Sequence, residues 1–477
     1  MFAAGSPAGA CAWRWLQEQS ATVTCICGLV VNADAERLSS LLTNLPVLAS
    51  ISELGAVSGL TLRPHPGAAV AATQDFLAGA ARAIGCCACL RRLDLLIDLG
   101  DMRADQVPGT VWHYLARARA LEDLDLSIRS GAADTHDRPA TACEPQVIAG
   151  LVGLSRLRTL ALELDTAYEN ATLPACVSRL AQLTSLRLSG LRGLRGAPGW
   201  ARLPALVCLD FEDCVFTRDG EAALPGMDAL ASLFSLRVWQ CPSLRTLPTS
   251  LWILTQLRQL EHWSCLLAPQ RDEPVSSLPA GAPCFAFLDR LTLSYDLPTW
   301  PTCVLAMTHL THLNLSGSCF EQVPESLSAL TALDTLCLGW DPPSLDEIGG
   351  ALDACALGNL AGFPALRSLN FDYCSVLFSP SFQAAAAHPR LKTVVLLTSY
   401  PALGSSCGAF LGFVTALLQQ GRAGVLRLQG SVVRGAGEHD GQSFRGALQA
   451  VGFALADDDD DDGARSVAED EYITDTE

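Results

Sequence analysis

The sequence predicts an α/β fold, a right-handed solenoid in which short parallel strands stack into one sheet over one continuous core. The main observation is a leucine pattern, L-x-x-L-x-L, that recurs from end to end. Each copy is too short to bury its own apolar side chains, so neighbouring copies must stack. The second observation is a composition of 49% hydrophobic and 17% charged residues, which is enough for a large core. The clear copies begin at Leu90, Leu121, Leu157, Leu183, Leu206, Leu233, Leu257, Leu288, Leu310, Leu333, Leu366 and Leu391, and the weaker ones at Val57 and Ala423.

A second pattern precedes the best copies and predicts the return segments. In the stretch from Val323 to Leu333, a proline is followed by leucines at every third position. That spacing suits a tight turn of 3₁₀ or α type that leads into each strand. We expect Pro324 and its counterpart Pro248 in the first turn of such a segment, where one amide lacks a partner anyway.

These patterns resemble the leucine-rich repeat proteins of the plant and algal intracellular type. The resemblance is closest over 241–260, CPSLRTLPTSLWILTQLRQL, and it extends roughly from Leu45 to Gln429. It implies a curved horseshoe of about fourteen units with the parallel sheet on its concave face. We expect an N-terminal capping region at 1–54, the repeat array at 55–430, a C-terminal helical cap at 431–456 and a disordered acidic tail at 457–477.

The charge balance indicates the kind of partner. The net charge is −18, and residues 457–477 contribute eight Asp, three Glu and one Arg to it. An acidic surface repels phosphate backbones, so we expect no nucleic-acid partner and favour a basic or Arg-bearing protein. The sequence shows neither a secretory signal at its start nor an apolar run long enough to span a membrane, which predicts no membrane contact and an intracellular, cytoplasmic location. The cytoskeleton, a ciliary axoneme and the nucleus stay open as sites of action.

Candidate catalytic and metal-binding residues have simpler structural interpretations. The sequence contains no nucleophile motif, P-loop or dinucleotide fingerprint, so we expect neither an enzyme nor a cofactor. Cys86 and Cys89 lack the second pair that a zinc site needs, and the spacing of His309 and His312 is a weak metal signal on a strand. His262 replaces the third leucine of its copy and should point inward. Four cysteines follow the first leucine of their copies by eight residues, where they should bond to the backbone of the bend after the strand: Cys214, Cys241, Cys265 and Cys374.

The strand residues between the leucines form the predicted binding surface. The leucines point inward, and alternation then turns the fifth and seventh residues of each copy outward, in two columns. Trp239 and Trp263 should stand on successive strands, about 4.8 Å apart. Aromatic side chains surrounded by charges are typical of protein-binding hot spots. The predicted partner-binding residues are Arg187, Asp210, Glu212, Arg237, Trp239, Glu261, Trp263, Asn314 and Asp372.

The sequence therefore predicts non-catalytic protein recognition through the concave face, as an adaptor, scaffold or substrate receptor. The segment CAWRWLQEQ at 11–19 resembles the segment that follows the F-box in algal F-box/leucine-rich repeat proteins, which implies a link to ubiquitin ligation. No F-box is recognisable in the sequence. An alternative resemblance, based on the array and the acidic tail, is to GTPase-activating proteins for the small GTPase Ran, for which Arg187 and Arg237 are the arginines to test.

Overall fold

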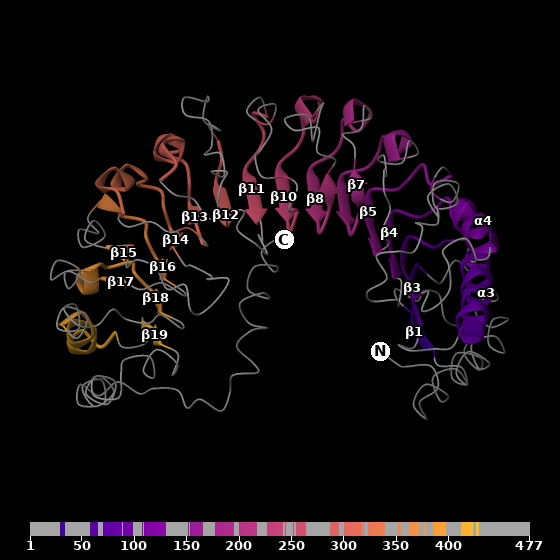
Figure 1. The fold of residues 1–477 in the computed structure, drawn as a ribbon, viewed down its shortest axis with the longest axis horizontal. Coiled ribbons are helices and arrows are strands. Elements are labelled where there is room, and N and C mark those ends of the chain that lie inside the picture. Colours follow the sequence, from indigo (N-terminus) through magenta and orange to yellow (C-terminus); the bar gives the residue numbers. More distant parts are fainter. Residues whose placement is uncertain are drawn as a thin grey trace. The chain divides into compact units, whose positions relative to one another are not determined.

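The computed structural model of the 477-residue chain divides into two compact units, unit 1 (Met1–Leu257) and unit 2 (Arg258–Glu477). Each unit is a stack of short parallel strands joined by tight turns (Figure 1). The described residues are 29–33, 58–64, 70–87, 89–98, 107, 109–129, 151, 153–165, 177–194, 200–216, 227–241, 244, 251, 254–263, 287–294, 300–316, 318, 323–338, 352–353, 362–371, 376–377, 385–396, 412–422 and 426–428.

The strands of unit 1 follow one another in chain order, and each pairs in parallel with the next. The first, β1, was not among the predicted copies; the other seven each contain a predicted motif. The strands are β1 (Leu29–Ala33), β2 (Gly59–Pro64), β3 (Arg92–Asp98), β4 (Asp123–Arg129), β5 (Thr159–Asp165), β6 (Ser185–Ser189), β8 (Cys208–Glu212) and β10 (Ser235–Trp239).

Unit 2 repeats the same arrangement with shorter strands, and all of them contain a predicted motif. Their order also follows the chain, with parallel pairing throughout. The strands are β11 (Gln259–Trp263), β12 (Arg290–Ser294), β13 (His312–Asn314), β14 (Thr335–Cys337), β16 (Ser368–Asn370), β18 (Thr393–Leu396) and β19 (Leu426–Leu428). Two small parallel pairs lie outside these stacks: β7 (Arg192–Leu194) with β9 (Val215–Phe216) in unit 1, and β15 (Leu352–Asp353) with β17 (Val376–Leu377) in unit 2.

Several of the described segments between the strands are helical, as the leucine spacing predicted. Helices α3 (Val70–Cys86) and α4 (Gly109–Arg117) precede β3 and β4, and Figure 1 shows both on the same side of the strands of unit 1. Shorter 3₁₀ turns take their place farther along: η2 (Val177–Arg179), η3 (Trp200–Arg202), η5 (Met227–Ala229), η7 (Thr302–Ala306) and η8 (Glu325–Ala329). Pro324 lies at the N-cap of η8, one residue before the predicted first turn, and its carbonyl accepts a hydrogen bond from the Leu327 amide at 3.0 Å. Pro248 lies outside the described residues.

The core consists of the motif leucines, as predicted. In the copy that forms β5, Leu157, Leu160 and Leu162 are all buried. Each such side chain contributes about 1.5–3 kcal/mol through its removal from water. An aromatic cluster continues this core in unit 1, where Trp200 and Phe216 each meet Phe211 edge to face, with ring centroids 6.1 and 5.3 Å from that of Phe211. His262 of unit 2 also points inward as predicted, because its side chain is buried.

The bends after β8 and β10 confirm the predicted role of two cysteines, Cys214 and Cys241. In three successive copies of unit 1 one residue takes a positive φ: Gly190 at 73°, Asp213 at 47° and Gln240 at 51°. The next residue is buried, and in two copies it is a cysteine. The Cys214 thiol lies 3.3 Å from the Leu188 carbonyl oxygen, and the Cys241 thiol lies 3.3 Å from that of Trp239. These thiols therefore satisfy backbone acceptors. The hydrogen bond with Cys214 raises the pKa of the Cys241 thiol, and burial adds to this, so Cys241 is a poor nucleophile. Cys265 and Cys374 lie outside the described residues.

The terminal regions are described in part. Within the predicted N-terminal capping region, residues 29–33 form strand β1, whose Leu29 pairs with Leu60 of β2. Residues 412–419 form a helix before β19. The predicted C-terminal cap at 431–456 and the tail at 457–477 lie outside the described residues, so these boundaries stay predictions.

Candidate functional site

Strand register places the predicted outward residues of unit 1 in two columns on the face of the sheet opposite α3 and α4, here called the open face. The fifth-position column runs Asp94, Asp125, Ala161, Arg187, Asp210 and Arg237. The seventh-position column runs Leu96, Ser127, Glu163, Ser189, Glu212 and Trp239. Five of the predicted binding residues therefore share three adjacent strands, β6, β8 and β10.

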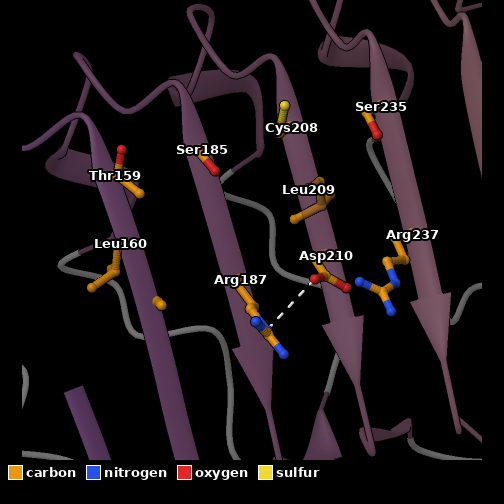
Figure 2. A pocket seen from close by; sticks show the side chains of 10 residues that line it. Thr159, Leu160, Ser185, Arg187, Cys208, Leu209, Asp210, Ser235 and Arg237 are labelled. Carbon is orange, nitrogen blue, oxygen red and sulfur yellow. Dashed lines mark ion pairs between the residues drawn. The ribbon is translucent and has the colours of Figure 1, made fainter. Parts of the chain in front are cut away.

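A shallow hollow of about 270 Å³ lies across these strands, and Figure 2 shows Arg187 and Arg237 on either side of Asp210 within it. Its walls are mostly small or polar side chains, and the two arginines lie at the same end. The lining residues are Thr159, Leu160, Ala161, Ser185, Arg187, Cys208, Leu209, Asp210, Ser235 and Arg237. A site so open suits a protein surface better than a small molecule, which a pocket normally encloses almost completely.

Arg187 is held by two carboxylates of the next strand. Its guanidinium lies 3.6 Å from Asp210 and forms a short ion pair with Glu212. Burial would lower the pKa of Arg187, but the bond to Glu212 and the charges of Glu212 and Asp210 outweigh it, so the net shift is upward. Because β6 and β8 pair in parallel with Arg187 opposite Asp210, the backbone fixes this triad in place. The arginine is thus a positioned positive charge on the open face.

Trp239 is the aromatic residue of this site, and its own strand supports it. The Arg237 guanidinium lies 4.7 Å from the Trp239 ring centroid, which is a cation–π contact. Register places Trp239 next to Glu212 of β8. The indole is partly exposed, so it is available to a partner while its ring is held by Arg237.

Glu163 of β5 belongs to the seventh-position column of the open face, opposite Ser189 of β6. Its carboxylate accepts a hydrogen bond from the Ser127 hydroxyl at 2.7 Å and one from Arg129 at 3.1 Å. Burial raises the pKa of Glu163, but the bonds from Arg129 and Ser127 exceed that effect and lower it below 4.5. Glu163 therefore stays ionised on the open face down to acidic pH.

Asp125 shows the opposite behaviour. Burial raises its pKa above 3.8, and the neighbouring Asp94 charge acts in the same direction, while Arg187 opposes it. Because the folded state holds this proton more tightly, the carboxyl contributes stability below pH 3.8 and loses it as the pH rises through the raised pKa. At neutral pH the ionised group therefore opposes folding.

We expect Asp125→Asn to stabilise the protein at pH 7 by about 0.5 kcal/mol, after allowance for solvent screening. The gain should shrink as the pH falls towards 3.8. Urea unfolding at several pH values measures it. Glu163→Gln is the control with the opposite sign: its carboxylate contributes stability above pH 4.5 that is lost as the pH falls through its lowered pKa. A destabilised Asp125→Asn at pH 7 would contradict the electrostatic account.

Comparison with solved structures addresses the fold. Over 86% of this chain and 47% of the other, the protein is similar to a chain of the glycosylated Toll–Spatzle complex of Drosophila, with 14% sequence identity and a TM-score of 0.50. A leucine-rich repeat protein of Leptospira interrogans is also similar, with 15% identity over 85% of this chain and 90% of the other, at a TM-score of 0.48. Neither a protein-family model nor a curated protein matches the sequence.

The fold is a leucine-rich repeat solenoid. The repeating motif, the parallel pairing in chain order and the likeness to the Toll chain agree on this point. At these identities the likeness extends to the fold alone.

The remaining predicted residues lie on the leucine-rich repeats of unit 2. Glu261 and Trp263 are on β11, opposite Thr292 and Ser294 of β12. The side-by-side placement of Trp239 and Trp263 stays a prediction, because each belongs to a different unit. Asn314 of β13 uses its side-chain oxygen locally, where it accepts a bond from the Ser316 amide at 2.9 Å. Asp372 lies outside the described residues.

The histidines of these repeats have local roles. The Thr311 hydroxyl lies 2.8 Å from Nδ1 of His312. Burial and the nearby Arg290 lower the pKa of His312 despite Asp334, so it is neutral at pH 7. His309 is exposed and stacks at 6.3 Å on Phe287. In the part of the chain that the structure describes, no three His, Cys, Asp or Glu side chains come together as metal ligands, and no helix is both long and apolar enough to cross a bilayer.

The sequence did not reveal two features of the outward columns. The first is the pairing of Arg187 with Glu212, which sits two positions along the neighbouring strand from the residue directly opposite. The second is Cys337, which stands in the outward fifth-position column of β14 yet is only 3% exposed. Alternation predicts the direction of a side chain, whereas its exposure depends on what packs over it.

Proposed function

We propose that the chain recognises a protein partner through the open face of unit 1, with the site formed by Arg187, Asp210, Glu212, Arg237 and Trp239. The observation that carries the proposal is the gathering of these five side chains on the adjacent strands β6, β8 and β10, where Arg187, Asp210 and Arg237 line one shallow hollow. A partly exposed tryptophan rimmed by fixed charges has the composition of an interface hot spot. The role is binding, as part of an adaptor, a scaffold or a substrate receptor in ubiquitin ligation.

The partner surface is basic or rich in arginine. On the open face, Arg63 pairs with Asp94 at 2.7 Å and Arg129 pairs with Glu163, so these cations are already neutralised. Burial raises the pKa of the Asp125 carboxyl, and the neighbouring Asp94 charge adds to this. A cationic side chain of the partner placed near Asp125 would relieve the repulsion between these two acids. Opposite charge on the partner speeds association and excludes acidic competitors.

The alternative function, stimulation of a small GTPase, requires an arginine that can enter another protein's active site. Arg187 is bound by two carboxylates, so its insertion would cost both ion pairs. GTP turnover by Ran with the wild-type chain and with Arg187→Ala and Arg237→Ala distinguishes the functions. Arginine-dependent acceleration would replace the binding proposal, and equal turnover in all three supports it.

We place this function inside the cell, in the cytoplasm or on the cytoskeleton. Seven described cysteines are free thiols, and Cys89 among them is exposed, which fits a reducing compartment. Residues 11–19 support the link to an F-box partner by resemblance only.

The site is tested with one aromatic substitution. We expect Trp239→Ala to weaken partner binding by about 30-fold, because hot-spot aromatics contribute about 2 kcal/mol or more. The wild-type chain is used to capture proteins from a lysate of the source organism, and those that Trp239→Ala fails to capture are purified. Calorimetry then measures the affinity of each purified protein for the wild-type chain and for the variant.

Phe287→Ala is the matched control. Phe287 is exposed, and it also makes a cation–π contact, with the Arg258 guanidinium 5.0 Å from its ring centroid. Unlike Trp239, it lies before β12 in unit 2. This variant should change the affinity by no more than about twofold. If every captured protein binds Trp239→Ala as tightly as wild type, the open face of unit 1 is not the site.

A further inference from the structure

A second surface of unit 1 differs from the open face in charge. It is the entry edge, formed by the turn residues before each strand and by the second residue of each motif. Backbone amides of these second residues bond to the carbonyl of the preceding copy: Arg158 to Glu122 at 2.7 Å, Thr184 to Arg158 at 2.7 Å, and Val207 to Thr184 at 2.8 Å. This ladder continues with the Phe234 amide bonded to Val207 at 2.8 Å. The entry edge is therefore a continuous, regularly spaced row.

Arginines dominate this edge. Arg156 and Arg158 flank the first leucine of the β5 copy, and both side chains are exposed. Arg179 and Arg202 end the adjacent turns η2 and η3, and Arg119 occupies the turn before β4. Within the described ranges none of these five guanidinium groups has an ion pair or a hydrogen bond, in contrast to Arg187 on the open face.

Two acids at the start of the same edge are already paired. Glu122 lies 3.9 Å from Arg91, and Asp123 lies 2.9 Å from Arg92. These pairs join the copies that form β3 and β4, at the start of the row. The entry edge from Arg119 to Arg202 thus carries a net positive charge on a protein whose overall charge is −18.

The row ends in exposed apolar side chains. Val207 and Phe234 are 37% and 41% exposed, and both follow Thr184 in the ladder. A free phenylalanine and valine side by side at the end of a cationic row form an amphipathic strip. Exposed apolar groups that adjoin polar ones are typical of protein interaction sites.

The equivalent described positions of unit 2 mix basic and acidic residues. The second-position residues Arg258, Arg367 and Lys392 are basic, Asp289 and Asp334 are acidic, and Arg367 pairs with Asp334 at 3.2 Å. Arg390 and Lys392 occupy the same motif positions as Arg156 and Arg158, and they are likewise exposed. This correspondence supplies a matched control within the same chain.

We infer that the entry edge of unit 1 binds an acidic protein segment that carries bulky apolar side chains at one end. Its carboxylates lie along Arg119, Arg156, Arg158, Arg179 and Arg202, and its apolar end contacts Val207 and Phe234. Bidentate pairing with carboxylates is the geometry for which guanidinium groups are best suited. A peptide fits better than a nucleic acid, because the aromatic residue stands at one end of the row and not between the arginines, and because the acidic open face repels a long polyanion.

The test uses a fluorescent 20-residue peptide of alternating Asp and Glu with Phe and Leu at one end, and measures its binding to the full chain by fluorescence anisotropy. We expect the double variant Arg156→Ser/Arg158→Ser to weaken binding about 10-fold, since each exposed charge pair contributes up to about 1 kcal/mol. The control Arg390→Ser/Lys392→Ser removes the same charge from the equivalent positions and should leave the affinity within about twofold.

A second pair of variants tests the apolar end. Val207→Ser/Phe234→Ser should weaken binding of this peptide but not of one in which Phe and Leu are replaced by Ser. Absence of binding to the full chain, or equal losses in the two arginine-site double variants, would overturn the assignment. A single-stranded oligonucleotide that displaces the peptide at a lower concentration than the unlabelled peptide does would assign the edge to nucleic acid instead.

Discussion

Trp200→Ala is expected to lower the free energy of unfolding of unit 1 by about 3–5 kcal/mol, the range for truncation of a large buried aromatic side chain. The indole is almost fully buried, and it packs edge to face against Phe211, which itself packs against Phe216. Neighbouring copies cannot close the cavity, because the backbone of each repeat is fixed by its ladder. Chemical denaturation followed by circular dichroism measures the loss.

Trp200→Phe distinguishes the contribution of aromatic packing from the effect of the polar Nε1 atom. In the described part of the protein, Nε1 of Trp200 has no hydrogen-bond partner, and an unpaired buried donor is costly. The phenyl ring keeps most of the aromatic contact and removes that donor, so we expect a loss of about 1 kcal/mol or less. A Phe variant as unstable as the Ala variant would show that the full size of the indole decides stability.

Gly153→Ala is expected to destabilise the protein by about 2 kcal/mol or more, through overpacking. A methyl group at Gly153 would lie 2.2 Å from the carbonyl oxygen of Ala116 and 3.1 Å from its carbonyl carbon. Both are backbone atoms at the end of α4, so the turn before β5 would have to move away from the helix. Thermal unfolding of the variant measures the effect.

Gly109→Ala is the control for this prediction. Gly109 is the first residue of α4, it is exposed, and an added methyl group would meet nothing within 4 Å. Alanine also favours a helix over glycine by up to about 1 kcal/mol. The control should therefore be neutral or slightly stabilising. Equal destabilisation in both variants would mean that glycine is needed for backbone freedom and not for space.

The fold was predictable because its determinants are local and repeated. Fourteen motif copies were expected, and every one forms a strand in the parallel stack of its own unit. Leu60 and Leu426 come from the weakest copies and still occupy the expected register. Strand β1 escaped prediction because LVVNA has strand-forming residues without the leucine spacing that marks the others. The spacing of the leucines alone could therefore not identify strand β1.

The sequence predicted where the side chains of the candidate site lie better than it predicted which contacts they make. Alternation placed Arg187, Asp210 and Trp239 on one face, as the register confirms. It could not show that Arg237 would cover the Trp239 ring, because a long side chain chooses among several neighbours. The arginines of the entry edge precede the strands, where alternation makes no prediction, so Arg156 and Arg158 became notable only when their lack of partners was known.

The parallel ladder has a consequence for how this molecule changes over evolutionary time. Each strand bonds only to the copies before and after it in the chain, so duplication or loss of one copy leaves both newly joined neighbours with complete hydrogen bonds. A substitution in one copy likewise changes the part of the surface that this copy contributes and leaves the part from the next copy unchanged. During evolution, such a protein can therefore lengthen, shorten or alter its recognition surfaces one repeat at a time. The arrangement of its core stays the same.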